Sequence, residues 1–255
     1  MSSLLELKAV SVSFGGLLAV SRLSFSVDKG QVYALIGPNG AGKTTVFNLI
    51  TGIVPAGSGE IIFDGQSLNG LPPYRIAGLG ITRTFQNLQL FGNMTVLENV
   101  MVGRHLRGRT GLLAAALHLP AKRREEEEML QAAQRQLELV GLEDRADWPA
   151  TALSFGEQRL LELARALAPE PGLLLLDEPA AGLNAGESRS LVELIARLKD
   201  RGITVLLVEH DMETVMSVAD RILVLDFGVK IAEGPPARVC SDPGVISAYL
   251  GEEVD

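Results

Sequence analysis

At residues 37 to 45 the chain reads Gly37-Pro38-Asn39-Gly40-Ala41-Gly42-Lys43-Thr44-Thr45. An apolar run, Val32 to Ile36, precedes this stretch, and an apolar segment that suits a helix begins at Val46. The order strand, glycine loop, helix is the setting of a phosphate-binding P-loop, and the spacing G-x-x-x-x-G-K-T is complete. A plain glycine-rich turn is the alternative. The glycines do not fit the G-x-G-x-x-G spacing of a dinucleotide site.

The chemistry of such a loop follows from its residue types. Glycines let the backbone bend so that successive N–H groups point inward, and the start of the next helix adds partial positive charge. Lys43 can reach the β- and γ-phosphates, and the Thr44 hydroxyl can ligate Mg²⁺. We therefore predict that a nucleotide is bound by the whole loop: Gly37, Pro38, Asn39, Gly40, Ala41, Gly42, Lys43, Thr44 and Thr45.

Length, charge and cysteine content restrict the class of protein. With 255 residues the chain suits one large domain, or a domain with a subdomain. A net charge of -8 argues against a broad nucleic-acid surface, which needs a basic face. The single cysteine, Cys240, excludes a disulfide framework and fits a reducing cytoplasm. We find no signal peptide pattern and no apolar run near the ~18 residues of a membrane helix, so we expect docking through a partner at any membrane.

Strand and helix patterns alternate through most of the chain. Strands followed by helices imply a largely parallel sheet with ligands at the carboxyl ends of its strands. The predicted class is α/β: a P-loop NTPase with a mostly parallel sheet core, N-terminal antiparallel strands and an inserted helical subdomain. Predicted strands cover 5–12, 23–27, 32–36, 59–65, 81–86, 173–178, 203–208, 221–225 and 229–232, and predicted helices cover 74–78, 96–102, 159–167, 191–201 and 212–219.

Strand patterns disappear between residues 88 and 149. Residues 120–140 predict a long amphipathic helix, because one face carries Met129, Leu130, Ala133, Leu137 and Val140. The predicted division is a nucleotide-binding core of 1–88 and 159–255, with a helical subdomain at 89–158. His105 and His118 match no motif and are predicted to be surface residues.

Two carboxylates follow a run of four leucines at the end of a predicted buried strand. Asp177 comes first, and a carboxylate held at the sheet edge is the usual second ligand of Mg²⁺ in P-loop proteins. Glu178 comes next and can act as general base toward water. The alternative is that Asp177 caps a helix that begins near Pro179.

Two other positions each have a functional and a structural interpretation. Phe14 lies on a loop before the P-loop, where its ring can stack on adenine, or it belongs to the core. Ser154 precedes a strongly helical stretch. It is a good N-cap, and a helix start with a serine and a glycine is also a phosphate site.

At this point the chain resembles the ATP-binding subunits of ABC transporters. Leu153-Ser154-Phe155-Gly156-Glu157-Gln158 is similar to their signature motif, and the leucine strand before Asp177 and Glu178 is similar to their Walker B strand. Further positions resemble the Q-loop glutamine, the D-loop and the switch histidine, in that order: Gln86, Gly182-Leu183-Asn184 and His210. The resemblance covers nearly the whole chain.

The resemblance implies a mechanism shared by two copies of the domain, closed head-to-tail on two ATP molecules. Each ATP would lie between the P-loop of one subunit and Ser154, Gly156 and Gln158 of the other. Thr44, Gln86 and Asp177 would surround Mg²⁺. The implied catalytic residues are Lys43 and His210, which would hold the γ-phosphate, and Glu178, which would polarise water.

Several segments resemble the branch that serves branched-chain amino acid uptake: 83–87, 90–100, 180–184, 231–239 and 248–251. Many relatives carry aspartate where this chain has Asn184. The resemblance implies these partners: a second ATP-binding subunit, identical or different, membrane permease subunits and, indirectly, a periplasmic or extracellular solute-binding protein. It places the chain peripherally on the cytoplasmic face of the inner membrane. No nucleic-acid partner is expected, because the net charge is -8.

Other functions stay open at this point. The solute could be urea, another amino acid or an exported lipid. The chain could also be a non-transport ABC ATPase that acts as a mechanical switch. A GTPase is disfavoured because no N-K-x-D stretch is present and the signature motif would go unexplained.

Overall fold

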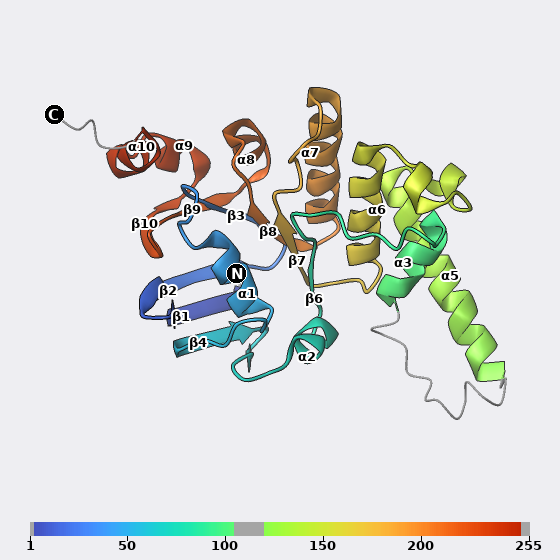
Figure 1. Ribbon diagram of the computed structural model, residues 1–255, viewed down its shortest axis with the longest axis horizontal. Coiled ribbons are helices and arrows are strands. Elements are labelled where there is room, and N and C mark those ends of the chain that lie inside the picture. The colour runs from blue at the N-terminus through green and yellow to red at the C-terminus, as the bar shows by residue number, and fades with distance from the viewer. Residues whose placement is uncertain (1–2, 105–119, 251–255) are drawn as a thin grey trace. The chain divides into compact units, whose positions relative to one another are not determined.

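The structure is a computed structural model that describes residues 3–104 and 120–250 (Figure 1). The chain forms two compact units, one of Met1–Arg83 with Gly172–Asp255 and one of Thr84–Pro171. The first limit lies at 83/84 and not at the predicted 88/89. The second differs from the predicted 158/159 because the helix that begins at Phe155 packs on the other helices of the second unit. His105 and His118 lie outside the described residues.

The first unit contains an antiparallel sheet near the N-terminus, as predicted. Its strands follow the order β2-β1-β4-β5, with β1 at Ser3–Phe14, β2 at Leu17–Asp28, β4 at Ser58–Phe63 and β5 at Gln66–Ser67. Gly15 and Gly16 join β1 to β2 with φ of 53° and 89°, a tight turn that favours glycine. β2 begins well before the predicted residue 23, since its early residues pair with the end of β1.

The second sheet of this unit is mostly parallel, in the order β10-β9-β3-β8-β7-β6. Only the β9–β10 pair is antiparallel among its described pairs. The carboxyl ends of β3, β7 and β8 therefore meet at one edge, where ligands bind in such sheets. The strands are β3 (Val32–Ile36), β6 (Ile81–Arg83), β7 (Leu173–Asp177), β8 (Thr204–Val208), β9 (Arg221–Asp226) and β10 (Val229–Gly234).

The helices of the first unit lie between its strands in the chain or follow the last of them. α7 begins at Ala185 rather than at the predicted residue 191 because Asn184 and Glu187 form a capping box before it. β6 ends at Arg83, whereas the predicted strand extended to Gln86. The helices are α1 (Lys43–Ile50), α2 (Pro73–Gly78), α7 (Ala185–Asp200), α8 (Met212–Val218), α9 (Pro236–Cys240) and α10 (Pro243–Leu250).

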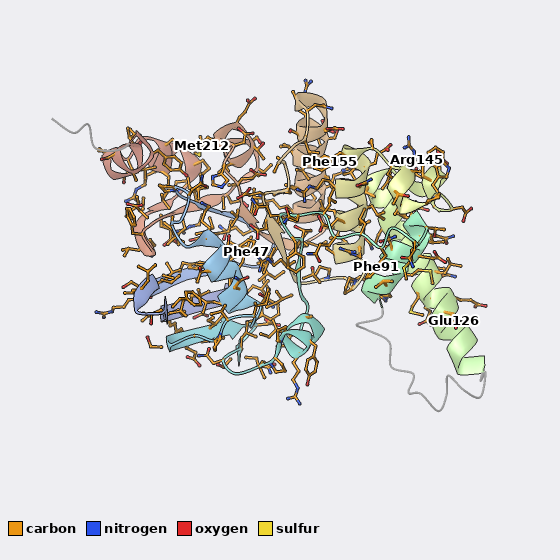
Figure 2. All side chains as sticks on the ribbon, in the orientation of Figure 1. Phe47, Phe91, Glu126, Arg145, Phe155 and Met212 are labelled. Carbon is orange, nitrogen blue, oxygen red and sulfur yellow. The ribbon has the colours of Figure 1, made fainter. Side chains whose placement is uncertain are left out.

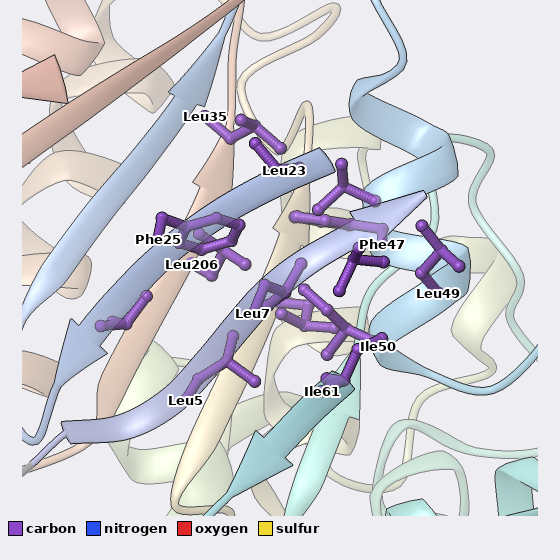
Figure 3. Packing of buried hydrophobic residues seen from close by; sticks show 14 of the residues in the cluster. Leu5, Leu7, Leu23, Phe25, Leu35, Phe47, Leu49, Ile50, Ile61 and Leu206 are labelled. Carbon is purple, nitrogen blue, oxygen red and sulfur yellow. The ribbon is translucent and has the colours of Figure 1, made fainter. Parts of the chain in front are cut away.

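A large apolar cluster fixes α1 against the strands of this unit. Figure 3 shows Phe47 and Ile50 of α1 beside Leu7 of β1 and Leu23 of β2. Phe47 and Ile50 are fully buried, and burial of each such side chain contributes roughly 1.5–3 kcal/mol. The N-terminus of α1 is thereby held at the end of β3.

The second unit is helical, with α3 (Val96–Arg104), α5 (Pro120–Val140), η2 (Glu143–Arg145), η3 (Ala150–Ala152) and α6 (Phe155–Leu167). α3, α5 and α6 pack on one another. On α5, Ala133, Leu137 and Val140 are buried and Met129 and Leu130 are half-buried, as the amphipathic pattern predicts. Phe91, Arg145 and Phe155 belong to this unit (Figure 2). Within residues 3–104 and 120–250, no helix combines the length and hydropathy needed to cross a bilayer.

Candidate nucleotide site

Close backbone approach makes two glycines of the loop irreplaceable. Gly37 has φ of +150°, and a Cβ there would lie 2.1 Å from the carbonyl oxygen of Leu225. Gly42 has φ of +103°, and its Cβ would lie 2.8 Å from the oxygen of Ala19. Gly40 also has positive φ, but nothing lies within 4 Å of its Cβ position. The loop is therefore wedged between β2 and β9 at two points and open at its tip.

Gly42 is also the N-cap of α1, and no side chain caps this helix. The first N–H groups of a helix have no partner within it, so they suit an anion. Lys43 opens the helix, and its Nζ donates to the oxygens of Gly37 at 2.7 Å and Pro38 at 2.9 Å. Burial lowers the pKa of Lys43, while the carboxylates of Glu178 and Asp177 act in the opposite direction. A desolvated ammonium thus lies across the loop.

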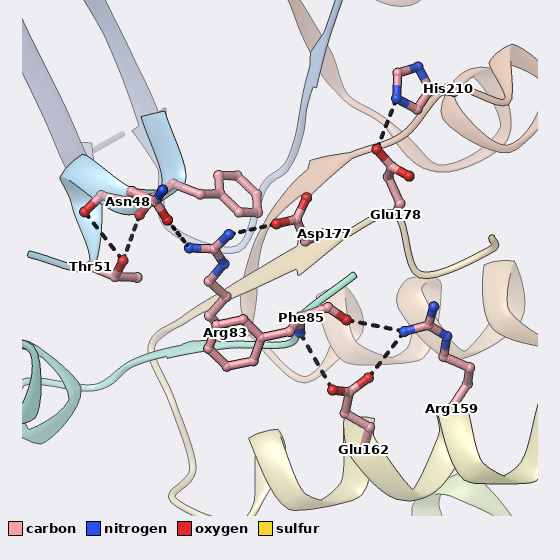
Figure 4. Close-up of polar contacts among 10 residues, drawn as sticks. Asn48, Thr51, Arg83, Phe85, Arg159, Glu162, Asp177, Glu178 and His210 are labelled. Atoms are coloured by element: carbon pink, nitrogen blue, oxygen red, sulfur yellow. Dashed lines mark hydrogen bonds and ion pairs between the residues drawn. The ribbon is translucent and has the colours of Figure 1, made fainter. Parts of the chain in front are cut away.

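Asp177 ends β7 in an almost fully buried ion pair. Its Oδ2 lies 2.6 Å from Nη2 of Arg83, and the two side chains are 5% and 7% exposed. Nη1 of Arg83 donates to Oδ1 of Asn48 at 2.7 Å, as Figure 4 shows. The alternative that Asp177 caps a helix is wrong, since the next helix begins at Ala185 and Asn184 caps it.

Glu178 follows in a backbone conformation that is uncommon for a residue with a side chain. Its φ is +49°, while its N–H donates to Val208 at 2.8 Å. Such left-handed residues cost about 1–3 kcal/mol and concentrate at functional sites. Oε1 of Glu178 lies 2.9 Å from Nε2 of His210 (Figure 4), so two predicted catalytic residues meet directly.

Glu209, which the sequence analysis did not single out, holds this arrangement together. Its carboxylate accepts from the N–H of Ala180 at 2.7 Å and from that of His210 at 3.0 Å. Burial raises the pKa of Glu209. A charged residue directly after a run of four apolar residues was the available signal, as it was for Asp177.

The side-chain atoms near the loop that could ligate a metal ion are oxygens. The described residues contain no group of three or more His, Cys, Asp or Glu side chains that could hold a metal ion by themselves. Asp177 and the Thr44 hydroxyl are hard ligands of the kind Mg²⁺ takes, usually together with substrate phosphates. The residues present therefore fit Mg²⁺ that arrives with a nucleotide.

Phe14 lies at the end of β1 and is 48% exposed, so the core interpretation is wrong. The ring is available to an adenine base, and its stacking role stays a prediction.

Comparison with known proteins places the chain. A family model described as ABC transporter matches residues 20–181, and one described as branched-chain amino acid ATP-binding cassette transporter matches residues 229–255. The chain belongs to the ABC transporter family. As an ABC protein it is an ATPase, which confirms the resemblance and the function class predicted from its motifs.

Individual relatives agree over almost the full length. The chain is 47% identical to the high-affinity branched-chain amino acid transport ATP-binding protein BraF of Pseudomonas aeruginosa and 46% identical to LivG of Escherichia coli K12, over 98% of each chain. A crystal structure of the ADP conformation of an ATP-binding cassette matches with a TM-score of 0.87 at 36% identity, covering 99% of this chain and all of that one. A nucleotide-free cassette gives 0.86 at 35% identity, covering 98% and 100%. The α/β fold class is confirmed.

The signature residues of this ABC protein lie at the start of α6. Ser154 is exposed and is the N-cap, with its Oγ 3.4 Å from the N–H of Glu157, so the capping interpretation is confirmed. Gly156 is buried, and Nε2 of Gln158 donates to the oxygen of Leu153 at 3.0 Å. Capping leaves the exposed face of Ser154 available, so a phosphate role stays a prediction.

Gln86 belongs to the second unit, whereas Thr44 and Asp177 belong to the first. Its role as a metal ligand therefore stays a prediction. Sequence reasoning also missed three charged residues that contact Asp177 or the residue before Gln86. Arg83 contacts Asp177, and Arg159 and Glu162 contact the backbone of Phe85. The signal for Arg159 and Glu162 was a pair of opposite charges three apart on the apolar, buried side of a helix.

Proposed function

We propose that ATP hydrolysis by this chain drives the uptake of branched-chain amino acids through a membrane permease. The observation that carries this proposal is the match of residues 229–255 to the branched-chain amino acid cassette model. Those residues include β10, α9 and α10, and Val239 and Val245 pack against Ala34 and Ile36 of β3. Relatives named for this transport, at 46–47% identity over nearly the full chain, support the same solute class.

The nucleotide would bind along the P-loop. The N–H groups at the start of α1 and the Lys43 ammonium would face its phosphates, and the exposed ring of Phe14 would stack on adenine. Thr44, Asp177 and Gln86 would hold Mg²⁺, which when bound neutralises charge on the phosphate oxygens. The desolvation of Lys43 supports this role, because a buried cation gains most from an anionic partner.

Glu178 would act as general base toward water. Its carboxylate oxygen is positioned by His210 at 2.9 Å, and Glu209 fixes the backbone of His210 and of Ala180 beyond Glu178. His210 would bind the γ-phosphate of ATP and could report the presence of that phosphate to Glu178.

A second ATP-binding subunit would complete each site with Ser154, Gly156 and Gln158. A solved dimeric cassette bound to ADP and phosphate supports a dimer; it is 26% identical to this chain with a TM-score of 0.76, covering 91% of this chain and 98% of that one. The proposed place of this dimer is the cytoplasmic face of the membrane, on permease subunits that receive solute from an external binding protein.

Reconstitution tests the proposal. The chain would be assembled with candidate permease subunits in liposomes, and ATPase activity would be measured with binding protein loaded with leucine, isoleucine or valine. We expect stimulation by these solutes and not by urea or lipid. Stimulation by urea or another solute alone would reject the solute class. Co-purification with RNA or ribosomes in place of a permease would favour a non-transport switch.

A further inference from the structure

One buried arginine connects α6, the signature helix, to the backbone of residues 84–88, here called the Q-loop. Arg159 of α6 donates from Nη1 to the oxygen of Phe85 at 3.1 Å and from Nη2 to the oxygen of Gln86 at 2.6 Å. Figure 4 shows the first of these contacts. A planar guanidinium that donates to two adjacent carbonyls fixes both position and direction, which a lysine ammonium does not.

Glu162, one turn further along α6, contacts both Arg159 and Phe85; we call Arg159 and Glu162 together the clasp. Its Oε2 lies 3.3 Å from Nη1 of Arg159, and its Oε1 accepts from the N–H of Phe85 at 3.5 Å. Arg159 and Glu162 are 6% and 2% exposed. A buried ion pair is often no more stable than an apolar pair of similar size, so stability alone does not account for it.

The same arginine also touches the signature motif. Its guanidinium lies 5.5 Å from the centre of the ring of Phe155, the residue between Ser154 and Gly156. Arg159 thus contacts both predicted functional segments of the second unit. Arg83, two residues before Phe85, is held instead by Asp177 and Asn48 within the first unit.

We infer that Arg159 and Glu162 are positioning residues for Gln86, because they fix the Q-loop backbone to the helix that carries Ser154 and Gly156. This inference rests on the proposed role of Gln86 as a Mg²⁺ ligand. The glutamine is then presented to the metal by α6, and a movement of the signature helix carries Gln86 with it.

Arg159→Met in the full chain tests this inference, with Arg104→Met as the matched control. Arg104 also lies in the second unit and donates to a backbone oxygen, that of Ala168 at 3.0 Å, away from the Q-loop. We expect hydrogen exchange of residues 84–88 to rise about 10-fold or more in Arg159→Met without nucleotide, and to stay unchanged in Arg104→Met. Arg159→Lys should give an intermediate rate, since an ammonium can serve one carbonyl.

The second measurement is the Mg²⁺ concentration needed to bind a fluorescent ATP analogue, in a Glu178→Gln background. We expect this concentration to rise about 10-fold in Arg159→Met, while binding of the analogue without Mg²⁺ stays unchanged. If Arg159→Met does not fold, the double variant Arg159→Met with Glu162→Leu removes both charges and serves in its place.

Two results would overturn the inference. One is equal exchange of residues 84–88 in Arg159→Met and Arg104→Met. The other is faster exchange with an unchanged Mg²⁺ requirement while Gln86→Ala raises that requirement, which would leave the clasp a purely structural role. A Gln86→Ala variant with the wild-type requirement would instead reject the proposed metal ligand, and the exchange rates would still decide whether Arg159 holds the loop.

Discussion

Nε2 of His210 lies 2.9 Å from Oε1 of Glu178, although 32 positions separate the two residues in the chain. β7 and β8 are parallel neighbours, so their carboxyl ends bring Glu178 and His210 to one edge of the sheet. Through this contact the imidazole of His210 orients the Glu178 carboxylate, which faces the reacting water in the proposed mechanism. In the proposed mechanism Glu178 and His210 act as one unit, so loss of either should affect the same step.

Glu178→Gln should bind ATP normally and lose turnover by roughly 10²–10⁴, the usual contribution of a positioned general base. The amide keeps the shape of the side chain but cannot accept a proton from water. ATP binding and steady-state hydrolysis measure the two effects. Glu213→Gln, an exposed glutamate at the start of α8, serves as the control and should leave both unchanged. Hydrolysis near the wild-type rate in Glu178→Gln would reject the assignment.

Gly37→Ala should prevent nucleotide binding and strongly destabilise the first unit. The new Cβ would lie 2.1 Å from the backbone oxygen of Leu225, which cannot move without distorting β9. Gly40→Ala is the control, because its Cβ meets only open space and its cost is the ~1–2 kcal/mol of a left-handed alanine. Chemical denaturation compares the stability of the two variants, and nucleotide titration measures binding by Gly37→Ala. Equal stability in both variants would show that the close approach at Gly37 is unimportant.

Arg83→Met should lower the free energy of unfolding by roughly 3–5 kcal/mol, because it removes the guanidinium partner of the almost fully buried Asp177 carboxylate. The exposed pair of Lys8 and Glu6 provides the comparison. Lys8→Met should cost about 0–1 kcal/mol, since water screens that pair. Urea denaturation followed by circular dichroism measures both, and similar losses would contradict the importance of burial.

Local sequence patterns predicted the elements and candidate site residues of this chain well wherever the pattern lay within a single segment. The glycine spacing before Lys43, the leucine run before Asp177 and the apolar face of 120–140 are all properties of one segment. Arg83 and Glu209 escaped notice because their roles depend on partners far along the chain, Asp177 at 94 positions and Ala180 at 29. The start of α7 was misplaced for a related reason. Residues 185–190 carry no large apolar side chain, and the capping box at Asn184 fixes where the helix begins.

Thr214→Val should weaken the start of α8 in a pH-dependent way. The Thr214 hydroxyl donates to Oδ2 of Asp211 at 2.6 Å. This hydrogen bond, together with those from the N–H groups of Thr214 and Glu213, holds the pKa of Asp211 below its usual 3.8. A carboxylate with a lowered pKa stabilises the fold above 3.8 and loses that contribution as pH falls through the lower value. We expect a deficit of about 0.5–1 kcal/mol at pH 7, at the low end because Asp211 is exposed.

Urea denaturation of Thr214→Val and of the unchanged protein, at pH 7 and at a pH well below 3.8, measures this difference. The deficit should shrink well below pH 3.8. A deficit that does not change with pH would mean that the valine acts through packing around the buried Thr214 position, and not through the Asp211 carboxylate.

Asn184→Ala should destabilise the protein by about 1 kcal/mol, because the Asn184 side chain accepts from the N–H groups of Gly186 at 2.9 Å and Glu187 at 3.0 Å. Asn184→Asp should keep that stability, since aspartate caps equally well and its charge suits a helix N-terminus. The aspartate variant therefore separates capping from the D-loop function proposed by resemblance. Unfolding free energy measures the cap, and ATPase stimulation by the reconstituted permease measures the coupling. If Asn184→Asp is stable but altered in stimulation, the amide itself contributes to communication between the two sites. If both values match the unchanged protein, that communication does not require the amide.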